Sequence, residues 1–279
     1  MVDEARELSR DVWDEMAPGW ERYRDYMWKT TRHVAEWLVE KVQPRDGDTI
    51  LDLAGGPGDN GFLAAERVGP SGRVIVTDFA PQMVEVARRR AAALSLDNVE
   101  TRVLDAERMD LDDDSVDGII CRWGFMLMLD PQAALHECRR VLKEGRRVTF
   151  SVWAGPETNP WVTVTGMTMM QLGHEPRRDP FGPGGMFSLA GHDTIRTMLE
   201  NAGFSDVTLE EMPVNWTYGS FDEAWGFMTQ VAGAVAALVK ELPGEEVERL
   251  RSALERNVEP FRTGPGLTLP GTTINGFAS

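Results

Sequence analysis

A glycine-rich segment that follows an acidic residue contains the residue types most able to do chemistry. It reads Ile50-Leu51-Asp52-Leu53-Ala54-Gly55-Gly56-Pro57-Gly58-Asp59-Asn60-Gly61. Glycines let the backbone approach a bound molecule closely, and a helix that begins after them offers unpaired N–H groups. Asp52 stands just before the glycines, a position that suits a cationic ligand better than a pyrophosphate. The segment therefore predicts the binding site of a cofactor.

Two further acidic positions fit such a site. Asp78 ends the second expected strand, 20 residues beyond Gly58, and Asp105-Ala106-Glu107 follows the third. Residues 56–61 fit the pattern G-x-G-x-x-G, so a nicotinamide-dependent oxidoreductase is one interpretation. S-adenosylmethionine is the favoured one. Asp52 suits its cationic group, and the acidic step at 105–107 could bind an adenine amino group. The third reason is that a sixth and a seventh strand are expected after the fifth.

The elements that must position these residues alternate between strand and helix. Apolar strands are expected at 49–53, 73–78, 99–104, 116–121 and 147–153, with helices at 62–68, 81–94 and 133–142. This alternation is typical of a parallel sheet with helices on both faces. A sixth strand is expected at 207–211 and a last one at 267–278. The sequence thus predicts a Rossmann-like α/β fold with a seven-stranded, mostly parallel sheet.

The remaining residues are predicted to add helices to a single domain. Residues 1–43 form an N-terminal cap of two helices, interrupted at Pro18-Gly19 and stopped by Pro44. Residues 44–155 form the cofactor-binding core. Two insertions, 156–190 and 217–266, are expected to close over the site, with helices at 162–172, 221–242 and 245–258. A further helix is expected at 194–202.

The overall composition limits the partners of the protein. Its 279 residues include 45 acidic and 29 basic side chains, for a net charge of −16, and such a surface disfavours nucleic acid. No stretch reaches the roughly 20 apolar residues of a membrane span, and a signal-peptide pattern is lacking, so we expect a cytoplasmic protein. With Cys121 and Cys138 as the only cysteines and four histidines, neither a disulfide framework nor a metal site is expected.

Taken together, the motifs resemble class I S-adenosylmethionine-dependent methyltransferases, particularly the ubiquinone/menaquinone-biosynthesis type that acts on small molecules. Residues 51–58 resemble the family's first motif, 76–83 its second and 105–107 its third. Residues 139–146, Arg-Arg-Val-Leu-Lys-Glu-Gly-Arg, resemble the turn before the fifth strand. Ala54 replaces the usual first glycine, and Glu144-Gly145-Arg146 replaces Pro-Gly-Gly. The resemblance covers about residues 45–155.

The resemblance implies a role for individual residues. Gly56 and Gly58 would line the methionine part of the cofactor, and Asp52 would hold its amino group. Asp78 would accept both ribose hydroxyls, and Asp105 the adenine amino group. The residues expected to bind the cofactor are Asp52, Ala54, Gly55, Gly56, Gly58, Asp78, Phe79, Met83, Asp105, Ala106, Glu107, Arg122, Trp123 and Trp20.

The implied reaction moves a methyl group to O, N or C of a small, partly apolar molecule and leaves S-adenosylhomocysteine. The two insertions are rich in methionine and aromatic residues, and the predicted acceptor-binding residues are Trp161, Met186, Trp225 and Met228. His33 is the best candidate for a base, although the activated sulfonium makes alignment and desolvation the main requirements. Two alternatives stay open: an NAD(P)-dependent oxidoreductase and a non-catalytic S-adenosylmethionine-binding accessory protein.

Overall fold

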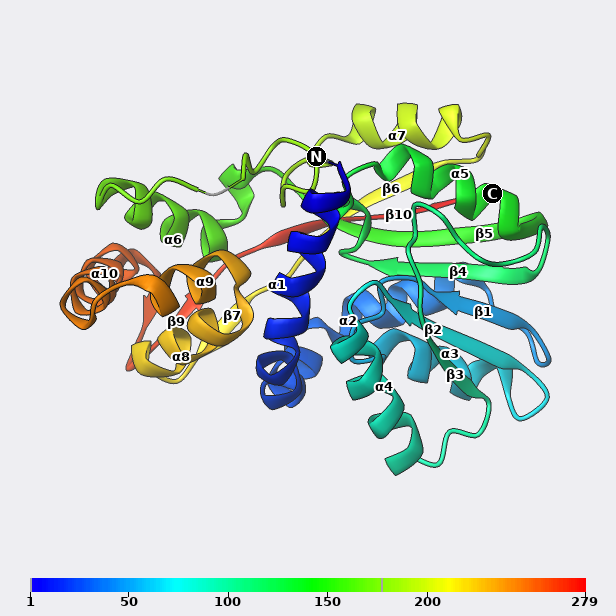
Figure 1. The fold of residues 1–279 in the computed structure, drawn as a ribbon, viewed down its shortest axis with the longest axis horizontal. Coiled ribbons are helices and arrows are strands. Elements are labelled where there is room, and N and C mark those ends of the chain that lie inside the picture. The colour runs from blue at the N-terminus through cyan, green and yellow to red at the C-terminus, as the bar shows by residue number, and fades with distance from the viewer. Residues whose placement is uncertain (1, 177) are drawn as a thin grey trace.

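The computed structural model describes residues 2–176 and 178–279 (Figure 1). Within them, the largest sheet has seven strands in the order β3-β2-β1-β4-β5-β10-β6. These are β1 (Thr49–Asp52), β2 (Arg73–Asp78), β3 (Val99–Val103), β4 (Val116–Arg122), β5 (Leu142–Trp153), β6 (Thr208–Pro213) and β10 (Thr272–Ala278). Among these described strands, β10 pairs antiparallel with β5 and β6, and every other adjacent pair is parallel. The predicted α/β fold with a mostly parallel seven-stranded sheet is confirmed.

The parallel register brings the predicted acidic residues to one edge of the sheet. Asp52, the last residue of β1, lies opposite Val76 of β2 and Ile120 of β4. Asp78 ends β2 opposite Val103, the last residue of β3. Because β1 has β2 on one side and β4 on the other, the strand order reverses at β1. Such a switch point is where open α/β sheets bind their ligands.

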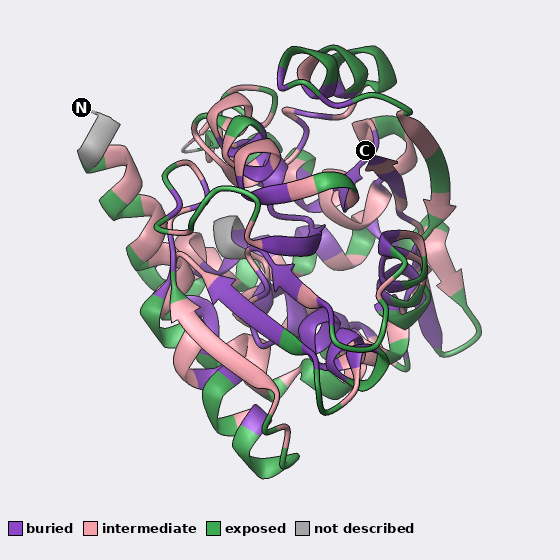
Figure 2. Cartoon of the chain, turned by 90° about the vertical axis from the view of Figure 1, so that its right-hand side faces the viewer, coloured by how far each residue is buried: buried purple, intermediate pink, exposed green. Residues whose placement is uncertain are grey.

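Helices cover both faces of this sheet. On one face, Trp37 of α2 (Arg24–Val42) packs on Phe277 of β10 with ring centroids 6.3 Å apart. On the other, Phe150 of β5 lies with Leu135 of α5 (Pro131–Val141) and Ile195 of α7 (His192–Asn201). Helices α3 (Asp59–Val68) and α4 (Pro81–Ala93) pack along β1, β2 and β3. The central strands are buried between these layers (Figure 2).

Local signals explain where several helices begin. Pro81 and Pro131 occupy the first positions of α4 and α5, where no backbone N–H is required. Asp130 caps α5, since its side chain accepts a hydrogen bond of 2.9 Å from the N–H of Ala133. These signals fix the helices that follow the cofactor-side strand ends.

A second group of elements lies beyond the carboxyl ends of the strands (Figure 1). It contains α6 (Pro160–Gln171), α8 (Phe221–Val231), α9 (Gly233–Glu241) and α10 (Gly244–Asn257). A small sheet accompanies them, formed by β7 (Trp216–Tyr218), β9 (Gly266–Leu269) and β8 (Arg262–Thr263) in that order. Helix α1 (Val2–Arg22) stands between this group and α4 and contacts both. Short helical turns η1 (Phe125–Leu127), η2 (Pro156–Thr158) and η3 (Glu259–Phe261) complete the described elements.

Three of the predicted boundaries are wrong. The N-terminal helices break at Tyr23 and not at Pro18-Gly19. Gly19 lies against α8, where an added Cβ would come within 2.0 Å of the Gln230 carbonyl oxygen, so packing overrides the local helix-breaking signal. The helix expected at 221–242 is divided at Ala232, and the strand expected at 267–278 is divided into β9 and β10. The sequence patterns also do not predict β7.

Candidate cofactor and acceptor site

The loop after β1 turns sharply with residues in the left-handed region. Ala54 has a φ of 51° and Gly56 a φ of 54°. A Cβ built on Gly56 would meet no atom within 4 Å, so a ligand can approach this stretch of backbone closely. At Gly55 and Gly61, by contrast, a Cβ would lie 2.6 and 2.9 Å from an oxygen of Asp52. One glycine therefore leaves room for a ligand, and two allow Asp52 to pack beneath the loop.

Asp52 is completely buried, and one of its carboxylate oxygens lacks a hydrogen-bond partner among the described residues. Its Oδ2 accepts a hydrogen bond of 2.8 Å from the N–H of Gly61, whereas the Asn60 side chain lies near the carboxyl group without forming a hydrogen bond of good geometry to Oδ1. Burial raises the pKa of Asp52 to about 7, against the opposing effects of the Gly61 N–H and the charge of Arg122. A buried carboxyl group with a free oxygen fits a ligand's ammonium group, which would supply the missing partner.

Asp78 accepts hydrogen bonds from the backbone of two loops, one after β1 and one after β2. Its Oδ2 accepts from the N–H of Gly56 and its Oδ1 from the N–H of Ala80, each at 2.9 Å. Burial raises the pKa of Asp78 to about 6, although these backbone donors oppose the shift. Each oxygen retains a second lone pair, so the carboxylate can still accept two ligand hydroxyls. In the structure, Asp78 thus holds the loop after β1 against the start of α4 and keeps lone pairs for further donors.

The acidic segment 105–107, after β3, contacts α1 and the loop after β4. Asp105 Oδ1 accepts from the N–H of Glu107 at 2.9 Å, and its Oδ2 lies 3.9 Å from Nε of Arg6. Glu107 forms an ion pair with Arg6 and accepts from the N–H groups of Leu129 and Asp130 at 2.8 and 3.0 Å. Glu107 therefore connects two loops and α1, while Asp105 lies between the Glu107 N–H and Arg6.

Helix α1 covers the start of α4. Met83 is 1% exposed and packs in a cluster with Met16, Ala17, Ala80 and Val86, against which Trp13 and Trp20 lie. Asp14 accepts a hydrogen bond of 2.8 Å from the N–H of Gln82. Arg10 of the same helix lies 5.9 Å from the centre of the Phe79 ring. Trp20, Phe79 and Met83 are thus placed on the Asp78 side of the site.

Arg122, predicted to face the cofactor, is held by protein groups. It is 8% exposed, its Nη1 donates to Oγ1 of Thr31 at 2.6 Å, and its Nη2 lies 3.6 Å from Oδ2 of Asp59. Burial lowers the pKa of Arg122, and the charges of Asp59 and Asp52 oppose this. Arg90 completes the network by donating to Asp59 at 2.7 Å. The network fixes the start of α3 beneath the glycine loop.

An aromatic cluster begins at Trp123 and continues into the added elements. Its members are Tyr23, Tyr26, Trp123, Trp153, Trp161, Trp216, Tyr218 and Phe227. Trp123 has a φ of 59° and stacks on Trp153 with centroids 4.6 Å apart. Trp161 lies 4.8 Å from Trp153 and 5.1 Å from Trp216. The sequence analysis predicted site roles for Trp123 and Trp161 but missed Trp216 and Tyr218, for which the alternating Trp216-Thr217-Tyr218 was the available signal.

The other predicted residues lie around this cluster or away from it. Met228 is buried in α8 and receives a contact of 3.7 Å from the Thr165 hydroxyl of α6. Trp225 and Met186 are partly buried and pack against the hydrophobic core. His33 is exposed, and its Nε2 lies 2.8 Å from the carbonyl oxygen of Pro213. That contact requires Nε2 to carry the proton, so this nitrogen is not a base.

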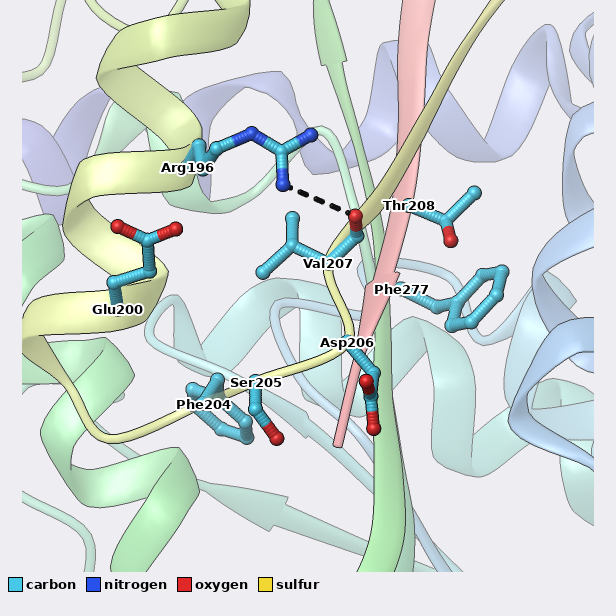
Figure 3. A pocket seen from close by; sticks show the side chains of 8 residues that line it. All are labelled: Arg196, Glu200, Phe204, Ser205, Asp206, Val207, Thr208 and Phe277. Carbon is cyan, nitrogen blue, oxygen red and sulfur yellow. Dashed lines mark hydrogen bonds between the residues drawn. The ribbon is translucent and has the colours of Figure 1, made fainter.

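An open hollow of about 600 Å³ lies at the opposite edge of the sheet (Figure 3). It is lined by Arg196, Glu200, Phe204, Ser205, Asp206, Val207, Thr208 and Phe277. Arg196 donates to the Val207 carbonyl at 3.2 Å. Thr208 begins β6, which runs parallel to the core strands, so the hollow opens at their amino ends. It is separate from the glycine loop and is not part of the cofactor site.

Residues 2–176 and 178–279 contain no group of three or more His, Cys, Asp or Glu side chains arranged to hold a metal ion. None of their helices has both the length and the apolar character that crossing a membrane requires.

Comparison with known proteins identifies the core of the chain. The model of a family described as a methyltransferase domain matches residues 44–172, which contain the loop, Asp52, Asp78 and Asp105. This segment is a class I S-adenosylmethionine-dependent methyltransferase domain. The strand order also differs from that of a dinucleotide-binding sheet, which has six parallel strands. In this chain, antiparallel β10 lies between β5 and β6.

The names of two relatives of this domain state different substrates. Arsenite methyltransferase of Halobacterium salinarum is 33% identical over 164 residues, 58% of this chain and 39% of that protein. Ubiquinone/menaquinone biosynthesis C-methyltransferase UbiE of Hahella chejuensis is 31% identical over 160 residues, 54% of this chain and 61% of that protein. The chain thus spans less than two thirds of the length of either relative.

A solved structure shares the fold over most of the chain. The YcgJ protein of Bacillus subtilis superimposes with a TM-score of 0.61 at 19% identity, covering 88% of this chain and 97% of that one. At this identity the likeness concerns the fold alone. The methyltransferase core is therefore shared, whereas residues after 172 lie outside the matched family segment.

Proposed function

We propose that the protein transfers a methyl group from S-adenosylmethionine to an O, N or C atom of a small, partly apolar molecule. The observation that carries the proposal is the buried Asp52, with its free oxygen, beside the open backbone of Gly56. Both lie at the switch point between β1 and β4. The cofactor supplies an activated methyl group on a sulfonium and leaves as S-adenosylhomocysteine.

The acids at the strand ends divide the binding of the cofactor between them. Asp52 would bind the amino group of the methionine part, and the Gly56 and Gly58 backbone would lie along it. Asp78 would accept the two ribose hydroxyls through its remaining lone pairs. Asp105 would bind the adenine amino group, with the buried Ala106 beside the ring. Each role places a polar group of the cofactor on a carboxylate that the fold already holds in position.

The acceptor would be bound on the side of the loop where the aromatic cluster lies. Trp123 stands directly after β4 and stacks on Trp153, so the cluster starts at the sheet edge. Rings there would exclude water, and a π face also favours a neighbouring cation. Trp161, Met186, Trp225 and Met228 remain the proposed acceptor contacts. Alignment and desolvation supply the rate, with the acceptor giving up its proton, where it has one, to solvent.

The helices outside the core would act with it as one domain. In this proposal, residues 1–43 cap the cofactor side, 44–155 bind the cofactor, and 156–190 and 217–266 cover the acceptor. The contacts of α1 with both α4 and α8 support a shared role for these parts.

Calorimetry and a methyl-transfer assay test this function separately. The protein is titrated with S-adenosylhomocysteine and with NADH, and only the first is expected to release binding heat. Asp52→Asn keeps the size of the side chain but removes its charge, and weaker binding is expected. Cell extract is then incubated with methyl-labelled cofactor and the protein, and a labelled small molecule is sought by mass spectrometry. Binding without any labelled product supports the accessory-protein alternative, and heat with NADH alone overturns the proposal.

A further inference from the structure

Two buried polar atoms in the aromatic cluster lack hydrogen-bond partners among the described residues. Trp216 is 2% exposed, and its indole Nε1 is buried and unpaired. The hydroxyl oxygen of Tyr26 is also buried, and although the Tyr218 and Thr30 hydroxyls lie near it, neither forms a hydrogen bond of good geometry. The Tyr26 and Trp216 rings lie 6.2 Å apart. Buried donors without a partner are rare in proteins, because each forfeits its hydrogen bond to water.

Two other indoles of the cluster have hydrogen-bond partners within the fold. Trp123 donates its N–H to the Thr273 hydroxyl at 3.2 Å. Trp161 donates its N–H to the Asn159 side-chain oxygen at 3.1 Å. Trp216 lies 5.1 Å from Trp161 and 6.5 Å from Trp153, in the same packed environment. Its missing partner therefore distinguishes it from Trp123 and Trp161.

The cluster leads from these two atoms to the glycine loop. Trp216 contacts Trp153, and Trp153 stacks on Trp123. Gly124, the next residue, lies against the loop, since a Cβ there would be 2.8 Å from Cβ of Ala54. A flat molecule lying along these rings would have one end at the loop and the other at Trp216. Tyr26 and Trp161 are only partly buried, so the cluster reaches the surface there.

The chemistry of the two atoms defines the group they can bind. An indole N–H can only donate a hydrogen bond. Burial raises the pKa of Tyr26 to about 12, so its hydroxyl keeps a proton that it can also donate. Two donors are satisfied together by one oxygen with two lone pairs, such as a carbonyl oxygen.

We propose that Trp216 and Tyr26 bind an accepting oxygen on a flat, apolar methyl acceptor and thereby determine which acceptors are used. The inference rests on the proposed function, because it assigns the cluster to the acceptor of that reaction. These two residues act in specificity and take no part in the chemical step. The prediction concerns binding, so it can be examined without knowing the natural acceptor.

A pair of probes that differ at one atom tests the inference. 2-Acetylnaphthalene carries a carbonyl oxygen, and 2-ethylnaphthalene has the same shape without it. Equilibrium dialysis measures the affinity of each, with and without S-adenosylhomocysteine. The wild-type protein is expected to bind the ketone about tenfold more tightly, the upper range for a neutral hydrogen bond. Trp216→Phe and Tyr26→Phe keep a ring and should reduce this preference, with little change for the hydrocarbon.

Stability and a matched control separate recognition from structure. Removing an unpaired buried donor breaks no internal hydrogen bond, but the smaller ring leaves a cavity, so Trp216→Phe should lower Tm only slightly. Trp37→Phe is the control, because Trp37 lies outside the aromatic cluster. Its indole N–H donates a hydrogen bond of 3.3 Å to Glu210. This variant should keep the ketone preference. Equal affinity for the two probes, no binding of either, or an unchanged preference in Trp216→Phe overturns the inference. Failure to bind S-adenosylhomocysteine would instead overturn the proposed function.

Discussion

At the scale of single residues, the acids of the cofactor site also hold their own loops in place. Asp78 receives backbone hydrogen bonds from Gly56 and Ala80, and it is the proposed partner of the ribose. We expect Asp78→Ala to weaken S-adenosylhomocysteine binding by about 2–4 kcal/mol, a little above the range for one charge-assisted bond. Calorimetry measures the loss. Because two internal bonds disappear as well, Tm should fall slightly, and unchanged affinity would contradict the ribose assignment.

The unpaired oxygen of Asp52 makes cofactor binding depend on pH. Without ligand, burial holds the pKa of Asp52 at about 7, so the carboxyl group is largely protonated below that pH. A bound ammonium favours the charged form, so binding must release a proton. The affinity for S-adenosylhomocysteine is therefore expected to fall as pH drops below about 7, by at most about tenfold per unit.

Calorimetry in buffers of different ionisation enthalpy counts the released protons. Near pH 6 the wild-type protein should release up to one proton per ligand through Asp52. Asp52→Asn has no proton to release there, so its affinity should be weaker and nearly independent of pH. A wild-type affinity that does not change between pH 5 and pH 7 would show that Asp52 does not bind the ammonium.

The sequence was sufficient for these acids and insufficient for the acceptor contacts. Asp52 and Asp78 each end a strand, and the parallel register alone brings strand ends together. Tyr26 and Trp216 come from α2 and β7, and their approach depends on how distant elements pack. Arg122 combines both cases, since its strand-end position follows from the sequence but its contacts with Thr31 and Asp59 depend on tertiary packing.

At the scale of elements, α1 is the proposed cover over the nucleoside end of the cofactor site. It is attached at Arg6 to Asp105 and Glu107, and at Asp14 to the start of α4. Arg6 lies where the adenine amino group is proposed to bind, so adenine and Arg6 compete for Asp105. We expect Arg6→Ala to accelerate association of S-adenosylhomocysteine about two- to fivefold, the range for a partly exposed ion pair.

Stopped-flow tryptophan fluorescence measures this association. Salt should speed the wild-type reaction, because it screens the Arg6 ion pairs, and should affect Arg6→Ala less. Arg249→Ala, which removes a surface pair with Glu246 on α10, is the control and should leave the rate unchanged. Slower association in Arg6→Ala would mean that the ion pairs support the site and do not compete with the ligand.

Helix α8 contributes two proposed acceptor contacts with different structural roles. Met228 is buried against α6, so its truncation also leaves a cavity that costs about 2–5 kcal/mol in stability. Trp225 is only partly buried and is the better test. With the acceptor found by methyl labelling, Trp225→Ala should raise its KM about tenfold while S-adenosylhomocysteine affinity changes little. Lost cofactor affinity with an unchanged KM would place α8 at the cofactor end.

The elements themselves were predicted with different success for a physical reason. The strands from β1 to β5 follow from apolar runs between glycine and proline signals, which are local. The course of α1 through Pro18 depends on Gly19 packing against α8, and β7 depends on pairing with β9. Both of these depend on tertiary contacts that are distant in the sequence.

At the scale of the whole molecule, the pKa values of some carboxyl groups are raised and those of others are lowered. Together they should make the free energy of unfolding largest at an acidic pH. Salt bridges hold the pKa values of Glu100 and Glu137 below their usual range, so their contribution is present near neutrality and lost as pH falls below about 4. Burial raises the pKa of Asp52 to about 7 and of Asp78 to about 6. Without ligand, their contribution is full below about pH 4 and is lost as pH rises to about 7. The growing negative charge of a chain already at −16 acts in the same direction.

We therefore expect the ligand-free protein to be most stable near pH 5 and to lose up to about 1 kcal/mol per pH unit and group toward pH 7. Urea denaturation at constant ionic strength measures this dependence. Asp52→Asn mimics the protonated carboxyl group, so it should be more stable than the wild type at pH 7 and equal to it near pH 4. S-adenosylhomocysteine should reverse the trend, because its ammonium stabilises the ionised Asp52 that burial penalises. A stability that rises steadily from pH 5 to pH 8 without ligand would show that the fold does not hold these two acids in an unfavourable charged state.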